Sequence, residues 1–408
     1  MSGECSPPAQ RELARVLITG IGLIGPGGSD RESCWQSLIR GDRCVRWLEN
    51  GLPGRWAGAP LPQLAVAAAG DNRMQTLALQ LVREALEDAE LSPIAPRPSD
   101  RARWGVVIGT SKGVMPSARE DGSLPWPHLA AQSVAQTWDL QGPVLCPVAA
   151  CATGLVCLWR GAELIRRGEC DVVIAGSVDA SLQPILQAAY RQMGVLAKIE
   201  DDPGFACRPF DRRRSGFLVG EGGAVMILES AASAVARGVT AYAEWLGGGI
   251  LSDPTGMTAL DDDAVALQVL IQRVLQAAQL EHTAIDVAAL HGTATIPNDQ
   301  YETRALRQVF GTHASRISCF GLKGGIGHLM GAAGSVETAA GLLAMRDRIV
   351  PPTVNLTDFD PVCDLDYTPH TARQRPLDYL LKISLGFGGH LAAAVFRRGD
   401  RLANKDRH

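Results

Sequence analysis

The sequence predicts an α/β protein built from two successive halves, with helices on both faces of its sheets. Short apolar runs typical of buried strands alternate with longer runs whose apolar residues recur at helical spacing. This alternation starts again near residues 235–240. A chain of 408 residues is long enough for two large halves that share a core. We therefore divide it into a polar tail (1–15), an N-terminal half (16–238), a C-terminal half (239–400) and a second polar tail (401–408).

The first half contains four apolar runs that predict buried strands. They are Val16–Ile24, Gly105–Gly109, Asp171–Ser177 and Ala224–Leu228. Ser29 to Glu32 supplies an N-cap and an acidic first turn for a helix that ends before Gly41. Further helices are expected at Met74–Ala89, which is clearly amphipathic, at 129–138 and at 155–167. The Gly/Pro/Ala-rich residues 50–70 predict a loop.

The second half continues with the same alternation. Predicted strands lie at Ala241–Leu246, Val287–Leu290, Ile317–Phe320, Lys382–Leu385 and Ala392–Phe396. Predicted helices lie between them at Asp263–Ala278, Gln300–Val309 and Ala332–Met345. Strands that alternate with helices predict sheets whose faces are covered by the helices.

Composition excludes several classes of function. A net charge of -4 and a pI near 6.1 give no basic field, so we expect no nucleic-acid partner. Ten cysteines without any C-x-x-C pair argue against a zinc ribbon and a disulfide framework, and indicate the reducing cytoplasm. The first fifteen residues lack the apolar region of a secretory signal, and no run of eighteen apolar residues predicts a membrane span.

Cys151 lies in the segment around which the chain is organised. Small residues surround it, and the run Leu155–Arg167 that follows has helical spacing, with Gly168 as its stop. Cys151 should therefore stand at a helix N-terminus, where unpaired N–H groups favour an anion and make a thiolate easier to form. The alternative for this segment alone is a buried structural cysteine.

Three later segments carry residues suited to chemistry. His291 ends a strand and opens a loop of hydroxyl residues, at the kind of strand exit where α/β sheets bind ligands. Five glycines surround Lys323 and His328, and a P-loop is excluded because Gly-Lys-Ser/Thr is absent. Ser384 to His390 is a strand that ends in a glycine turn able to aim N–H groups at an anion.

These segments resemble the β-ketoacyl-[acyl-carrier-protein] synthases, and they occur in that family's order. The motifs are Ala150-Cys-Ala-Thr-Gly154, His291-Gly-Thr, Lys323 with Gly327-His-x-x-Gly-Ala-Ala-Gly334, and Gly386-Phe-Gly-Gly389. Weaker similarity extends from Val16 to Arg397. The resemblance implies a thiolase fold, a five-layer αβαβα sandwich of two βαβαβαββ halves that is usually dimeric.

The resemblance also implies roles in catalysis. Cys151 corresponds to the family's nucleophile. The backbone N–H groups of Cys151 and Phe387 correspond to the oxyanion hole. His291 and His328 match two neutral imidazoles that stabilise the enolate left after malonyl-carrier protein loses CO2. Lys323 matches the lysine that supports the second histidine, and we expect Glu302 to be its partner.

Substrate residues follow from the same resemblance. Thr293 and Thr295 match hydroxyls that hold the phosphopantetheine arm, and Phe387 matches the gate between acylation and condensation. Lys112 borders the acyl pocket in a loose alignment, which argues against a long saturated chain. The substrates are carried by an acyl carrier protein, and neither a cofactor nor a catalytic metal is expected.

Three departures from the family pattern stand out. Ala294 replaces the commoner Gly or Ser, and His390 with Leu391 replaces Thr-Asn. We expect His390 to hold the turn by hydrogen bonds rather than to act as a third catalytic imidazole. Ile383 stands where an Asn is common, so the match to the family's structural cation site is incomplete although Glu337 is present.

We therefore predict a free-standing, cytoplasmic β-ketoacyl synthase that works by a ping-pong mechanism. It would act in fatty-acid synthesis or in the synthesis of polyketides and other secondary metabolites, and the departures favour the second. It would form a homodimer, or a heterodimer with a related condensing-enzyme subunit. A thiolase is disfavoured by the glycine setting of His328, and a non-catalytic chain-length-factor-like subunit by Cys151. A relative that only transfers acyl groups would keep Cys151 and stays open.

Overall fold

The computed structural model describes residues 13–49, 54–62, 73–91, 96–112 and 126–399. The predicted C-terminal tail and nearly all of the predicted N-terminal tail lie outside these ranges.

Ten strands form one continuous hydrogen-bonded sheet that consists of two five-stranded parts. The first part has the order β5-β4-β6-β7-β1, with β1 Val16–Ile24, β4 Trp104–Gly109, β5 Val144–Leu145, β6 Val172–Ala180 and β7 Glu221–Ser230. The second has the order β8-β14-β13-β9-β10, with β8 Ala243–Ser252, β9 Val287–Ala289, β10 Ser318–Phe320, β13 Tyr379–Gly386 and β14 His390–Arg398. Among the described strands, the two parts are joined by the pairing of Val16–Ile18 with Ala243–Trp245.

Strand directions repeat from one part to the other. In the first, β5, β4 and β6 are parallel, whereas β7 and β1 pair antiparallel. In the second, β10, β9 and β13 are parallel, whereas β14 and β8 pair antiparallel. The predicted boundary at residues 238–239 falls between α6 (Ala231–Arg237) and β8.

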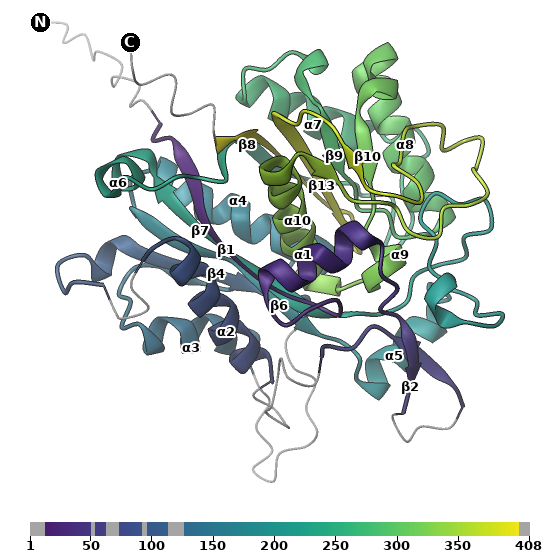
Figure 1. The fold of residues 1–408 in the computed structure, drawn as a ribbon, viewed down its shortest axis with the longest axis horizontal. Coiled ribbons are helices and arrows are strands. Elements are labelled where there is room, and N and C mark those ends of the chain that lie inside the picture. Colours follow the sequence, from purple (N-terminus) through teal and green to yellow (C-terminus); the bar gives the residue numbers. More distant parts are fainter. Residues whose placement is uncertain (1–12, 50–53, 63–72, 92–95, 113–125, 400–408) are drawn as a thin grey trace, which may run out of the picture.

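The helices complete five layers, as Figure 1 shows. Helices α2 (Arg73–Asp88) and α3 (Leu129–Thr137) cover the outer face of the first sheet part, and α7 (Val265–Ala277) with α8 (Ile296–Phe310) lies outside the second. Between the parts lie α4 (Thr153–Arg166) and α10 (Ala333–Asp347). Every residue of α10 from Ala333 to Met345 is buried, as expected for a helix enclosed on all sides. The predicted αβαβα sandwich is thus confirmed.

The two central helices approach each other closely at their N-termini. A Cβ placed on Gly154 would lie 2.3 Å from the backbone nitrogen of Ser335, so only glycine fits there. Ser335 of α10 also hydrogen-bonds Ser177 of β6 at 2.6 Å. This contact brings the segment before α4, which carries Cys151, next to the segment before α10, which carries His328.

Most predicted elements occur, and their differences have physical reasons. Helix α1 (Arg31–Arg40) is capped by Asp30 and ended by Gly41, as predicted. β8 continues six residues past its predicted end at Leu246, because it stays paired with β14 as far as Ser252, which lies opposite His390. Part of the predicted 50–70 loop is a strand, β3 (Trp56–Gly58), paired with β2 (Arg46–Leu48).

Several short elements were not predicted. They include β5, α5 (Pro184–Gln192), α6, α9 (Lys323–Ile326), β11 (Ile349–Val350) and β12 (Arg373–Gln374). Within the described ranges, no helix has the length and apolar character needed to cross a membrane.

Candidate active site

Cys151 lies in one tight turn, Ala150–Ala152, directly before α4. Ala150 has a φ of 47°, a left-handed conformation that bends the chain sharply at the nucleophile. Thr153 fixes the bend, because its Oγ1 accepts from the Ala149 N–H at 2.8 Å and donates to the Ala150 carbonyl at 2.7 Å. The predicted helix-start position of Cys151 is therefore present.

The thiol of Cys151 is buried, with 5% of the residue exposed. Burial raises the pKa of Cys151 to about 11, while the charges of Lys323 and Lys112 act in the opposite direction. Burial thus opposes the thiolate that the helix-start position and the two lysines favour.

His328 follows Gly327, whose φ of 71° turns the chain before α10. Its backbone joins the segment directly before β7 by two hydrogen bonds, to the Leu218 carbonyl at 2.7 Å and from the Gly220 N–H at 2.9 Å. The ring Nδ1 accepts from the Met330 N–H at 3.1 Å. Burial, then the nearby lysines, lower the pKa of His328 well below its ordinary value, so the ring is neutral and carries its proton on Nε2.

His291 stands just past β9 and has the same tautomer for a different reason. Its Nδ1 lies 3.3 Å from the Nζ of Lys323, an ammonium that can only donate. Burial, then Lys323, lower the pKa of His291 well below its ordinary value. The two imidazole rings stand perpendicular, 5.3 Å apart between centroids. Both therefore offer an Nε2–H donor.

Lys323 is held differently from our prediction. Its Nζ donates to a carboxylate oxygen of Glu337 and to the backbone carbonyl of His291. Glu302 instead accepts from the N–H groups of His291 at 2.6 Å and Gly292 at 2.7 Å. Glu302 was wrongly predicted as the lysine's partner, because the two backbone N–H groups occupy its carboxylate. Lys323 hydrogen-bonds His291, and its charge also acts on His328, in line with the predicted electrostatic support.

Gly386, at the end of β13, packs against the nucleophile turn. A Cβ there would lie 3.2 Å from the backbone nitrogen of Cys151 and 2.6 Å from the Ala149 carbonyl oxygen. The turn that begins with half-buried Phe387 is thus brought beside the Cys151 N–H. This is the neighbourhood in which two backbone donors could receive an oxyanion.

One cavity of about 340 Å³ unites the predicted residues. Its lining includes Cys151, His291, Thr293, Thr295, His328 and Phe387. The hydroxyls of Thr293 and Thr295 hydrogen-bond each other at 2.8 Å. Between these two residues, Ala294 has a φ of 60°, which explains why glycine would suit that position.

Lys112 lies near this site but does not line the cavity in the described part of the chain. Its Nζ hydrogen-bonds Ser181 at 2.7 Å and lies 3.6 Å from a carboxylate oxygen of Asp179. Burial opposes its charge, but Asp179 and Tyr190 outweigh that effect and raise the pKa of Lys112. The charge of Lys112 acts on Cys151, and the predicted effect of Lys112 on the acyl chain stays a prediction.

His390 begins β14 and is exposed. Its backbone pairs with Gly386, but its ring has no hydrogen bond to any residue that the structure describes. Neither the expected turn-holding hydrogen bond nor a place in the cavity lining is found for it.

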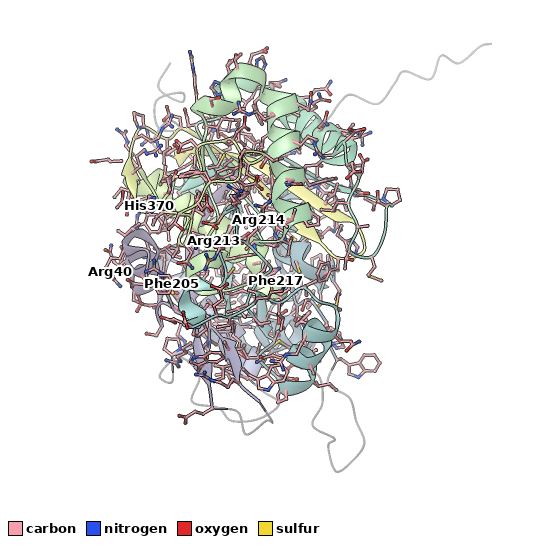
Figure 2. All side chains as sticks on the ribbon, turned by 90° about the vertical axis from the view of Figure 1, so that its right-hand side faces the viewer. Arg40, Phe205, Arg213, Arg214, Phe217 and His370 are labelled. Carbon is pink, nitrogen blue, oxygen red and sulfur yellow. The ribbon has the colours of Figure 1, made fainter. Side chains whose placement is uncertain are left out.

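Three residues that shape the site were given no role from the sequence. The Phe217 ring packs edge-to-face against the His328 ring, with 4.9 Å between the ring centroids. The Asp179 carboxylate accepts a hydrogen bond from the Gly331 N–H at 3.1 Å. Phe217 follows a loop that contains Arg214 (Figure 2). The side chain of Arg214 is fully buried and forms ion pairs with Asp299 and Asp360.

The third of these residues is Lys382, whose Nζ donates a hydrogen bond to Glu337 at 2.7 Å. A lysine in the middle of an apolar strand was the available signal.

Comparison with known proteins agrees with this geometry. The family model for the N-terminal domain of β-ketoacyl synthases matches residues 66–234, and that for the C-terminal domain matches 242–357. The ketoacyl synthase alpha subunit of the tetracenomycin polyketide synthase of Streptomyces glaucescens is 36% identical, over 94% of this chain and 97% of its own. The chain belongs to the β-ketoacyl synthase family. This β-ketoacyl synthase is thus an enzyme of the acyltransferase class.

Other relatives of this β-ketoacyl synthase extend the picture. The 3-oxoacyl-[acyl-carrier-protein] synthase 2 of Coxiella burnetii is 32% identical over 95% of this chain and 99% of its own. A β-ketoacyl synthase from Burkholderia phymatum superposes with a TM-score of 0.85 at 30% identity, covering 95% and 100% of the two chains. A type II polyketide ketosynthase in complex with its acyl carrier protein superposes with a TM-score of 0.86 at 29% identity, covering 95% and 99%. These relatives are condensing enzymes of polyketide and fatty-acid synthesis.

Proposed function

We propose that this β-ketoacyl synthase is a ketosynthase of a type II polyketide system, which condenses a Cys151-bound acyl group with malonyl-carrier protein. The observation that carries the proposal is one cavity that holds a thiol, two neutral imidazoles with Nε2–H donors, and the Phe387 turn. No cofactor takes part in the proposed reaction.

The first step is acyl transfer to Cys151. The sulfur attacks the carbonyl of the incoming thioester, and the N–H groups of Cys151 and Phe387 receive the charge on its oxygen. The carbon–sulfur bond to the carrier arm then breaks. The arm leaves as a thiol with the proton that Cys151 gives up, and an acyl-Cys151 remains.

The second step is decarboxylation and condensation. The bond between the malonyl carboxylate and its α-carbon breaks, CO2 leaves, and the electron pair forms a thioester enolate. The Nε2–H groups of His291 and His328 donate to the enolate oxygen, a role for which neutral rings are suited. The α-carbon attacks the acyl carbonyl, and Cys151 leaves as a thiolate that takes up a proton.

The carrier arm would pass the paired hydroxyls of Thr293 and Thr295 at the cavity wall. The carrier protein itself enters the proposal through the relatives, one of which was solved in complex with its acyl carrier protein. Half-buried Phe387 would act as the gate that separates the two steps.

A related subunit would complete the protein at its β5 edge. β5 is the last strand of the sheet, and Val144 on it and Val148 just after it are 41% and 51% exposed. An open strand edge with apolar side chains is suited to pairing with another chain. A similar structure, 26% identical, is a ketosynthase with its chain length factor, which favours a heterodimer.

The test is reconstitution with an acyl-carrier protein and malonyl-carrier protein, followed by intact-protein mass spectrometry and CO2 measurement. We expect acyl mass on Cys151, release of one CO2 per condensation, and a β-ketoacyl product on the carrier. Cys151→Ala should neither load nor condense.

Two controls separate this proposal from its rival. Cys207→Ala, at another buried cysteine, should still load. Loading of the unaltered enzyme without any CO2 release or condensation would overturn the proposal in favour of simple acyl transfer.

A further inference from the structure

Lys382 is a buried lysine in the middle of β13 that no step of the proposed reaction uses. It is 0% exposed, whereas lysine is almost never fully buried without a partner. Because side chains alternate along a strand, Lys382 shares a face with Leu380 and Ser384. That face meets α10, where Leu380 packs at Gly341 and Ser384 at Gly334.

Three oxygens from three elements surround the ammonium. Nζ donates to Glu337 Oε2 of α10 at 2.7 Å and to the Ile383 carbonyl of β13, and it lies 3.4 Å from the Ala289 carbonyl of β9. An ammonium has three N–H donors, so this set satisfies it. One carboxylate and two carbonyls are also oxygen ligands of the kind that hold a hard cation.

The contacts continue from Lys382 to the catalytic imidazole. The other oxygen of Glu337 accepts from Lys323, whose Nζ lies 3.3 Å from His291 Nδ1. Ala289, the third partner of Lys382, is the last residue of the strand that presents His291. Lys382 therefore holds both the carboxylate behind Lys323 and the strand behind His291.

The structural cation implied by the family resemblance does not fit these residues. Each carboxylate oxygen of Glu337 already accepts from an ammonium, Lys323 or Lys382. The carbonyl oxygens of Ala289 and Ile383 are occupied by Lys382 as well. A metal ion would be a third positive charge beside one carboxylate, and like charges in a buried site repel strongly.

We propose that Lys382 is a positioning residue whose ammonium is a built-in cation, which holds Glu337 and thereby keeps Lys323 against His291. Lys323 in that place keeps the His291 proton on Nε2, where decarboxylation uses it. The kinetic part of this inference rests on the proposed function.

The first experiment separates the two half-reactions in Lys382→Met, which removes the charge at similar volume. We expect CO2 release from malonyl-carrier protein to fall roughly 10- to 100-fold, the range typical of residues that orient the imidazole ligands of metal sites. Loading of Cys151 should be retained. Ser384→Ala, on the same face of β13 and also fully buried, is the matched control and should keep both rates.

The second experiment compares potassium, methylammonium and choline chloride as the only added salt. The unaltered enzyme should have the same Tm and CO2 release in all three. Lys382→Ala should gain Tm with rising potassium or methylammonium, since a ligand that binds only the folded state stabilises it. Its CO2 release should recover in part with the same salts.

Several outcomes would overturn the inference. They are a potassium requirement of the unaltered enzyme, full CO2 release by Lys382→Met, and equal loss of loading and CO2 release in that variant. If Lys382→Met does not fold, the Tm of Lys382→Ala provides the test. A Tm of Lys382→Ala that does not change with potassium or methylammonium would count against the inference. If the unaltered enzyme releases no CO2, the proposed function fails, whereas the Tm comparison still tests Lys382.

Discussion

The Nδ1 atom of His328 lies 3.1 Å from the backbone nitrogen of Met330 and accepts its hydrogen bond. This contact assigns the proton of the neutral ring to Nε2. The backbone of Leu329, with a φ of -81° and a ψ of 21°, turns this N–H back toward the ring. A backbone group cannot be titrated, so the tautomer of His328 is fixed at any pH at which the protein is folded and the ring is neutral.

Replacing His328 should separate decarboxylation from loading. His328→Ala removes one of the two donors to the enolate oxygen, and loss of one such donor costs roughly 10²–10³ in rate. Cys151 loading uses other donors and should continue. We expect CO2 release, measured from labelled malonyl-carrier protein, to fall by that factor. Normal release would contradict the role assigned to His328.

His390→Asn is the next prediction and serves as the control for His328→Ala. The His390 ring is exposed and makes no hydrogen bond within the described residues, so its loss should change little. We expect full loading and CO2 release, and a change in the free energy of unfolding within about 0.5 kcal/mol. A loss of turnover equal to that of His328→Ala in a folded variant would place His390 in the chemistry.

The pH dependence should reflect two neutral imidazoles. Burial lowers the pKa of His291 and His328 well below the ordinary value of about 6.5. CO2 release should therefore stay level from about pH 8 to about pH 6 and fall only in stronger acid. The unfolded chain binds these protons first, so the free energy of unfolding should decrease as pH falls below about 6.5. Loss of CO2 release already near pH 7, measured in one buffer series, would contradict neutral rings.

Lys112 should influence the reactivity of the Cys151 thiol. Since burial raises the pKa of Cys151 to about 11 and Lys112 lowers it, Lys112→Met should leave less thiolate at a given pH. We expect alkylation of Cys151 by iodoacetamide, followed by mass spectrometry, to slow by roughly tenfold, which corresponds to one pKa unit. Lys198→Met, at an exposed lysine, is the control. An unchanged rate in Lys112→Met would mean that Asp179 already cancels its charge at the thiol.

Local patterns predicted the parts of the site that local structure creates. Cys151 at a helix start, His291 at a strand exit and His328 in a glycine-rich turn each depend on a few neighbouring residues. These positions could therefore be read from the sequence, with the family resemblance supplying their roles.

Contacts between distant segments could not be read in the same way. Glu302 and Glu337 are both buried acids near Lys323, and nothing in their sequence shows which carboxylate is already occupied by backbone N–H groups. Lys382 lies in a run that predicts only a buried strand, and its partner is 45 residues away. The thiol pKa depends on total desolvation, which the whole fold determines.

Gly386 should be indispensable for loading, because it lets β13 approach the nucleophile turn. In Gly386→Ala the new Cβ would lie 2.6 Å from the Ala149 carbonyl oxygen, a distance that forces the turn and the Phe387 N–H apart. Loss of one oxyanion donor costs roughly 10²–10³ in rate, so loading followed by mass spectrometry should slow by about that factor. CO2 release depends on the imidazoles and should fall less. Gly25→Ala, whose Cβ would meet only Cys34 Sγ at 4.0 Å, is the matched control and should load normally. A folded Gly386→Ala enzyme that loads as fast as Gly25→Ala would show that the oxyanion is bound elsewhere.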